Sequence, residues 1–295
     1  MRNTVVRAIA AVCLVALVGP PLAAAEFVLK VMTFNIRLSP ANDGPDRWEV
    51  RKPMVADAIR QFNGDFVGVQ EAWADQIAFL SENLPEYRSI GRSREADPST
   101  GEGTPLYYRH DRWKLDPQQH GTFWLSDTPD IPGSRTWGNE IPRIVTWGRF
   151  IEATTGRAVS VINTHFDHRS EPSRRQSAAQ LARFVAERAK QELVVVTGDF
   201  NAPEDSYAIR FLRGEMPDPP IRLVDTFRVA HPDAVEVGTF GGFRGDVAGA
   251  KIDYVFTLPT VRVLSAEIVR TNQDGRYPSD HYPVTAELAF PALSP

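Results

Sequence analysis

Two hydrophobic patterns alternate along the chain, one typical of strands and one typical of helices. Short apolar or alternating runs predict strands over residues 27–36, 65–70, 105–109, 144–152, 158–164, 193–197, 252–257 and 282–290. Three other segments space apolar side chains by three and four residues, which predicts helices around 50–62, 77–84 and 178–185. The basic residues 174, 175, 183, 188 and 190 lie off the apolar face of the last helix, where we expect a solvated surface.

The order of these elements predicts one α/β domain over residues 26–295. Helix-rich stretches fall at comparable places in the two halves of the chain, each beside strands. Two stacked mixed sheets with helices outside satisfy this order, because each sheet and each helix must bury an apolar face. Strand ends would then converge on one edge of the sandwich.

Residues 1–25 have the three parts of a secretory signal peptide. Arg2 and Arg7 precede the apolar run 8–18, and small residues at 23–25 offer a cleavage site before Glu26. The run is too short to span a bilayer comfortably, so the mature chain is expected to lack a transmembrane segment and to be periplasmic or extracellular. The single cysteine, Cys13, follows Val12, which argues against a lipoprotein and leaves a mature chain without disulfides.

Composition and charge narrow the function classes. Hydrophobic residues make up 42% of the chain, which is ordinary for a globular protein. The 33 basic and 37 acidic residues give a net charge of −4, and loss of the signal peptide would remove two arginines more. Proteins that bind nucleic acid through its phosphates are usually basic. Nucleic acid is therefore a less favoured partner.

Polar residues stand at or just after several predicted strands, where core packing does not require them. One such residue alone is more often a cap or a turn former. A whole set at the same edge indicates a functional site. The set comprises Asn35, Glu71, His165, Asp167, His168, Asp199, Asn201, Asp253, Asp280 and His281.

Oxygen donors in this set are suited to a hard divalent cation. Glu71 and Asp280, with the amide oxygen of Asn35, are the ligand types that Mg²⁺ or Mn²⁺ prefers. The mature chain has no cysteine and no histidine pair at helical zinc spacing, so a zinc peptidase is disfavoured. No nucleophile elbow or phosphate-binding glycine loop appears, and the stretch 238–249 is expected to be a mobile loop.

The remaining residues suit attack by water on a phosphate. Asp199 can orient or deprotonate a water molecule. His165, Asn201 and His281 can donate hydrogen bonds to phosphate oxygens as charge develops. Asp253 can hold the ring of His281 through its other nitrogen.

The motifs MTFNIR, VQE, THFDH, GDFN, IDYVF and SDH, in this order, resemble the endonuclease/exonuclease/phosphatase superfamily, which includes deoxyribonuclease I. The segment from GTFWLSD to PRIVTW resembles a bacterial subgroup of metal-dependent hydrolases. The resemblance implies a four-layer α/β/β/α sandwich and a divalent-metal phosphoesterase that attacks phosphorus in line with water. It also implies the roles given above, with Glu71 the firmest metal ligand. The segment GTPLYYR departs from the polar turn usual in relatives.

Three classes of function remain. A phosphodiesterase or phosphatase acting on a small or lipid-linked phosphoester is favoured over a secreted nuclease by the acidic charge. A non-catalytic binding module is least favoured, because it needs no complete catalytic set. The nuclease would require a basic patch, for which residues 135, 143, 149, 169, 174 and 175 are the candidates.

Some residues outside the motifs are also candidates for substrate contact. Arg143 and His168 are candidates for substrate phosphate contact; the alternatives are a surface salt bridge and a helix-start hydrogen bond. Aromatic residues at 123, 124, 137 and 147 would either stack on a substrate or lipid, or pack in the core.

Overall fold

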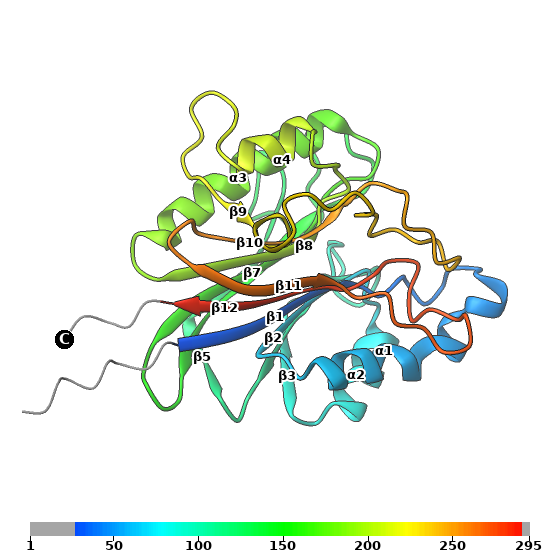
Figure 1. The fold of residues 1–295 in the computed structure, drawn as a ribbon. Helices are drawn as coiled ribbons and strands as arrows, with labels where there is room; N and C mark the ends of the chain where they lie inside the picture. The colour runs from blue at the N-terminus through cyan, green and yellow to red at the C-terminus, as the bar shows by residue number, and fades with distance from the viewer. Residues whose placement is uncertain (1–26, 291–295) are drawn as a thin grey trace, which may run out of the picture.

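The computed structural model describes residues 27–290, in which two six-stranded sheets pack face to face (Figure 1). The signal peptide predicted for residues 1–25 lies outside the described residues. In spatial order, the first sheet consists of β11 (Arg262–Ile268), β12 (Val284–Phe290), β1 (Phe27–Asn35), β2 (Phe66–Gln70), β4 (Leu106–Arg109) and β3 (Tyr87–Ile90). The second consists of β5 (Trp113–Trp124), β6 (Ile144–Glu152), β7 (Ala158–His165), β8 (Leu193–Asp199), β10 (Asp253–Thr257) and β9 (Val224–Asp225).

Helices cover the outer face of each sheet (Figure 1). α1 (Trp48–Phe62) and α2 (Ala74–Asn83) lie on the first sheet, and α3 (Glu171–Ala189) and α4 (Tyr207–Leu212) lie on the second. A short 3-10 helix (Gly44–Asp46) precedes α1, and α5 (Thr226–Ala230) follows β9. This is the predicted α/β/β/α sandwich. None of the helices in the described range is long and apolar enough to cross a membrane.

Three apolar clusters hold the four layers together. The middle cluster joins the inner faces of the two sheets, where the rings of Phe66 and Phe150 lie 4.8 Å apart. A second cluster packs α1 on the first sheet, and a third packs α3 on the second. The aromatic residues at 123, 137 and 147 pack against this third cluster and Trp124 is buried, so these side chains serve the core.

Each sheet contains one parallel strand pair joined by a helix. β1 pairs with β2 through α1, and β7 pairs with β8 through α3. Parallel strands end at the same edge of a sheet, and that edge is where α/β proteins place ligands. Asn35, Glu71, His165 and Asp199 stand at or directly after these four strand ends.

A buried polar layer joins the two sheets directly beneath that edge. Gln70 Nε2 donates to Asn163 Oδ1 at 2.7 Å and to Thr33 Oγ1 at 2.9 Å, while Thr197 Oγ1 donates to Asn163 Oδ1 at 3.1 Å. A side chain at Gly68 would collide with Thr197 and Asn163, so glycine permits this approach of the sheets. All four polar side chains are fully buried.

The polar layer fixes the two halves of the site relative to each other. Residues two apart on a strand point to the same face. Thr33, Asn163 and Thr197 therefore lie one step below Asn35, His165 and Asp199, and Gln70 immediately precedes Glu71. Hydrogen bonds are directional, so this layer restricts sliding between the sheets more than an apolar layer would.

Candidate active site

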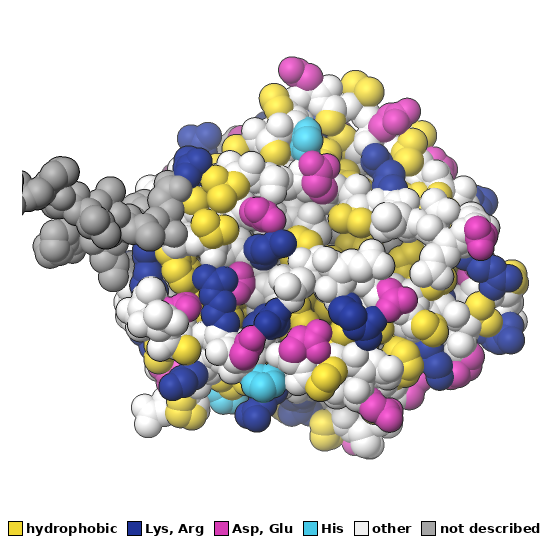
Figure 2. All heavy atoms as spheres, turned by 60° about the horizontal axis from the view of Figure 1, so that its bottom comes forward, with side chains coloured by type: hydrophobic (Ala, Val, Ile, Leu, Met, Phe, Trp, Pro, Cys, Tyr) yellow, Lys and Arg dark blue, Asp and Glu magenta, His cyan; other side chains and the backbone are white. Residues whose placement is uncertain are grey.

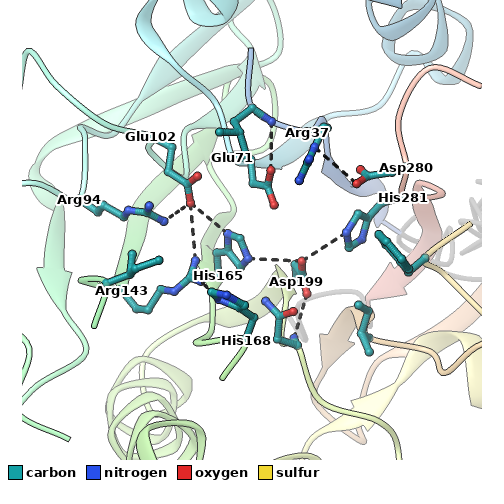
Figure 3. Close-up of a pocket in the computed structure, with 15 residues that line it drawn as sticks. Arg37, Glu71, Arg94, Glu102, Arg143, His165, His168, Asp199, Asp280 and His281 are labelled. Carbon is teal, nitrogen blue, oxygen red and sulfur yellow. Dashed lines mark hydrogen bonds and ion pairs between the residues drawn. The ribbon is translucent and has the colours of Figure 1, made fainter. Parts of the chain in front are cut away.

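The predicted polar residues gather around one pocket of about 470 Å³ (Figure 3). Seven of the ten residues in the predicted polar set line it, and so does Arg143. The other three are buried behind the lining: Asn35 and Asp253 hydrogen-bond to residues that line it, and Asp167 lies 3.7 Å from Arg143. Asp280 and His281 reach the site from the segment before β12, whose strand runs antiparallel to β1.

Asp199 occupies the centre of the pocket, buried at the end of β8. Its Oδ1 accepts the backbone N–H of Asn201 at 2.9 Å, and its Oδ2 accepts Asn35 Nδ2 at 2.9 Å. The Nε2 atoms of His165 and His281 lie 3.4 and 3.8 Å from Oδ2. Burial, and then the charge of Asp253, raise the pKa of Asp199. A carboxylate with a raised pKa is a better proton acceptor near neutral pH.

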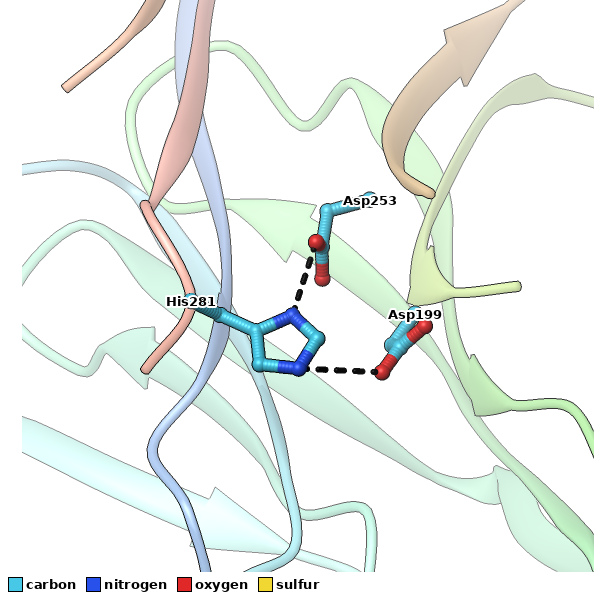
Figure 4. Close-up of side chains that lie close together, drawn as sticks. All are labelled: Asp199, Asp253 and His281. Atoms are coloured by element: carbon cyan, nitrogen blue, oxygen red, sulfur yellow. Dashed lines mark hydrogen bonds and ion pairs between the residues drawn. The ribbon is translucent and has the colours of Figure 1, made fainter. Parts of the chain in front are cut away.

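His281 lies between two carboxylates (Figure 4). Asp253 Oδ2 is 2.9 Å from His281 Nδ1, which is the contact predicted from the sequence. Burial on its own would lower the pKa of His281, but Asp253 and Asp199 raise it well above its ordinary value. The ring is therefore a charged donor, with Nδ1 directed to Asp253 and Nε2 facing Asp199.

Asp199, Asp253 and His281 also form a group whose ligand atoms lie within 4.8 Å of one another. Such a group can hold a metal ion in principle. Here, however, both ring nitrogens of His281 already face carboxylates. The arrangement therefore fits an oriented imidazolium better than it fits a metal ligand.

Glu71 and Asp280 form a second acidic region of the pocket. Glu71 has a positive φ of 61° directly after β2, an uncommon conformation for a residue other than glycine, and strained backbone of this kind clusters at functional sites. Its carboxylate accepts Asn35 Nδ2 at 3.1 Å and the backbone N–H of Leu38 at 3.0 Å. Burial raises the pKa of Asp280, and Glu71 adds to the rise.

This second region fits a divalent cation. Its two carboxylates destabilise each other's charge, and hard oxygen donors of this kind bind Mg²⁺ or Mn²⁺. The positive groups near them are His281, Arg37, whose Nε lies 3.7 Å from Asp280, and buried Arg51. Asn35 presents its amide nitrogen to Glu71 and Asp199, while its oxygen accepts the N–H of Arg37. Its place as a metal ligand stays a prediction.

Arg143 and His165 mark the opposite end of the pocket. Burial, and then the charge of Arg143, lower the pKa of His165 to about 3, so this ring is neutral. Arg143 is buried, with Glu102 at 3.6 Å and Asp167 at 3.7 Å, and its Nη2 lies 3.0 Å from His168 Nδ1. The contacts exclude a surface salt bridge for Arg143. They also differ from the helix-start alternative for His168, because Ser170 caps α3.

Three charged residues of the pocket are absent from the sequence prediction. Glu102 and Arg94 form an ion pair beside His165, and Arg37 lies next to Asp280. Glu102 and Arg94 belong to a loop, so no strand end pointed to them, whereas Arg37 directly follows the predicted strand 27–36 and is not among the residues selected there. Glu102 stands between two glycines in a turn-like stretch. This stretch has no periodic hydrophobic pattern, so the sequence does not predict where Glu102 lies in the fold.

Comparison with known proteins identifies the class of this site. A family model described as the Endonuclease/Exonuclease/phosphatase family matches residues 32–281. The chain therefore belongs to this family, and it is a hydrolase that acts on phosphoester bonds. No curated protein matches the chain.

Three solved bacterial structures are similar over nearly their whole length. An endonuclease/exonuclease/phosphatase from Bacteroides vulgatus is 35% identical, with a TM-score of 0.81 over 89% of this chain and 98% of its own. A family protein from Bacteroides thetaiotaomicron is 29% identical, with a TM-score of 0.81 over 90% and 99%. A mannosyl-6-phosphatase from Bacteroides thetaiotaomicron is 30% identical, with a TM-score of 0.79 over 89% and 100%.

Metal binding is expected to stabilise the protein. A cation that binds only the folded state adds about 2.7 kcal/mol at a hundredfold excess over its Kd. We expect Mg²⁺ or Mn²⁺ to raise the Tm of the chelator-treated protein, measured by calorimetry. Glu71→Gln should reduce this shift while leaving the metal-free Tm close to that of the unmodified protein. A Tm unchanged by saturating metal would contradict a cation site at Glu71 and Asp280.

Proposed function

We propose that this protein is a divalent-metal-dependent phosphomonoesterase that acts on a small phosphate ester, with a sugar phosphate as the first candidate. The observation that carries the proposal is the placement of Asp199 between an acidic region at Glu71 and Asp280 and a basic region at Arg143. A phosphate that bridges these two regions presents its phosphorus to a water molecule next to Asp199.

The chain's own side chains supply the proton transfer and the charge stabilisation. Asp199 accepts a proton as the water oxygen bonds to phosphorus, the bond from phosphorus to the leaving oxygen breaks, and solvent protonates that oxygen. His281, held by Asp253, donates from Nε2 to the phosphate, and His165 and Asn201 are the further donors. A cation held at Glu71 and Asp280, Mg²⁺ or Mn²⁺, would neutralise phosphate charge when bound.

Arg143 supports a monoester over a diester. Its Nε and Nη1 atoms are buried and have no hydrogen-bond partner in the structure, although two carboxylates lie within 4 Å. A terminal phosphate carries one more charge than a diester and three free oxygens, which can use these donors together with His168. A mannosyl-6-phosphatase is among the similar structures, which supports a sugar phosphate as the substrate class. The pocket volume of about 470 Å³ also falls within the range of small-molecule sites.

The arginines that a nuclease would need for a basic patch all have other contacts in the described part of the chain. Arg143 is buried, and the other five candidate arginines make contacts with acidic side chains or carbonyl groups. Those contacts are Arg135 to the Glu140 carbonyl, Arg149 to Asp116 and Glu192, Arg169 to Glu140, Arg174 to the Asp167 carbonyl and Arg175 to Glu171. On the face drawn in Figure 2, basic and acidic side chains are interspersed.

Export remains part of the proposal. The pattern of residues 1–25 supports a mature enzyme that works in the periplasm or outside the cell, on phosphate esters available there.

A substrate panel tests the proposal. Inorganic phosphate release from mannose 6-phosphate and glycerol 3-phosphate is compared with hydrolysis of bis-p-nitrophenyl phosphate, sphingomyelin and plasmid DNA, each with Mg²⁺ or Mn²⁺. We expect kcat/KM for at least one monoester to exceed that for every diester. A faster diester would overturn the monoester proposal, and cleavage of DNA alone would favour the nuclease.

A further inference from the structure

Phe240 is an exposed aromatic residue at the active-site pocket. Its side chain keeps 46% of its surface accessible. Among residues 27–290, the other large hydrophobic residues that are exposed are Ile131, Val229, Val235 and Leu264, and none of these lines this pocket. A single exposed apolar side chain is common on a protein surface. Because this one lies beside catalytic groups, a ligand bound there can remove its ring from water, which is favourable.

The backbone holds Phe240 firmly next to His281. The N–H groups of Gly241 and Gly242 both donate to the Asp280 carbonyl, at 2.7 and 3.0 Å, and Tyr282 N donates to the Thr239 carbonyl at 2.7 Å. A side chain at Gly241 would collide with the Tyr282 ring, so this close approach requires glycine. The predicted mobile loop is thus anchored at its start to the segment that carries Asp280 and His281.

Contact with His281 places Phe240 within reach of the leaving group. The two ring centroids lie 5.1 Å apart, with an angle of 70° between the planes. His281 is proposed to donate to the phosphate. A leaving group attached to that phosphate therefore lies close to the Phe240 ring, which contacts His281. Leu38, Ile141 and Ile252 add apolar surface to the same pocket, while Arg94 and Glu102 add polar groups.

We propose that Phe240 is a specificity residue that binds the apolar face of a pyranose ring in the leaving group. A pyranose has C–H groups on one face and hydroxyl groups around its edge. The C–H face suits the aromatic ring of Phe240, while the hydroxyl edge can face water. This inference rests on the proposed phosphomonoesterase activity and names the class of its substrate.

The test compares a phosphate ester that has a ring with one that has none. Phe240→Ala should lower kcat/KM for mannose 6-phosphate about tenfold more than for glycerol 3-phosphate, since an aromatic contact worth about 1.4 kcal/mol is lost only with the ring. The loss should appear in KM rather than kcat. Phe240→Tyr keeps the ring and should keep the preference.

Two controls separate this contact from a general defect. Leu264→Ala removes another exposed apolar side chain, away from the pocket, and should leave kcat/KM unchanged for both substrates. Thermal unfolding of each variant checks that the loop change leaves the fold intact. Equal losses of Phe240→Ala on both substrates would overturn the inference.

A third substrate separates sugars from nucleobases. If Phe240→Ala lowers kcat/KM more for adenosine 5′-monophosphate than for mannose 6-phosphate, Phe240 stacks on a base and the pyranose assignment is wrong. If the unmodified protein releases phosphate from no monoester, the proposed function itself fails. Those outcomes are distinct from a protein that hydrolyses mannose 6-phosphate without any selective effect at Phe240.

Discussion

Asp199→Asn is expected to lower kcat by a factor of about a hundred to ten thousand, the usual cost of losing a general base. The amide can still accept a hydrogen bond from Asn201 or Asn35, but it cannot take the proton from water. KM should change little, because the groups proposed to bind phosphate remain. Steady-state phosphate release at saturating metal measures both constants.

The stability of this variant provides its control. Asp199 is buried, and its pKa is raised by burial and by Asp253, so its charge is costly in the folded state. A neutral side chain should relieve part of that cost. We therefore expect the Tm of Asp199→Asn to stay close to that of the unmodified protein. Near-normal turnover in the folded variant would remove Asp199 as the base.

His281→Ala should reduce kcat by roughly a hundredfold to a thousandfold, as for loss of one preorganised donor to the transition state. In the proposed mechanism, Asp253 does not contact the substrate and acts only by orienting the His281 ring. Asp253→Ala should therefore lower kcat by itself but cause little further loss of kcat in the His281→Ala background.

A double-mutant cycle in kcat measures this dependence. Its comparison set is the unmodified protein, the two single variants and the double variant, all assayed on one monoester. Independent, multiplicative losses would show that Asp253 has a role apart from the ring, for example in holding β10 against β8, where it lies opposite Asp199.

The sequence predicts the interior of this fold better than its edges. Every strand expected from the pattern is present within about two residues. Each of the three predicted helical segments overlaps a helix, although α3 is much longer than the apolar segment that predicts it. The strands that the pattern misses are β3, β5, β9 and β11, which are the edge strands of the two sheets. Edge strands bury less surface, so their hydrophobic alternation is weak. β5 also carries Pro117 and a shift in register between Leu115 and His120.

The site residues, too, were easier to predict from the sequence where they adjoin a buried strand. Residues at the ends of buried strands, such as Asp199 and His165, were predictable because a polar residue contrasts with the apolar run before it. Glu102 and Arg94 come from a loop and have no such contrast. Gln70 lies within the motif VQE and Asn163 directly precedes THFDH, but only the structure shows that they meet across the two sheets.

Metal-dependent release of inorganic phosphate tests the central claim most directly. Chelator-treated protein is incubated with mannose 6-phosphate in excess EDTA, and then with Mg²⁺ or Mn²⁺ in excess over the chelator, with Asp199→Asn in parallel. The account predicts no turnover in EDTA, recovery with metal, and little recovery in the variant. Undiminished turnover in EDTA, or a variant that recovers as fully as the unmodified protein, would contradict it.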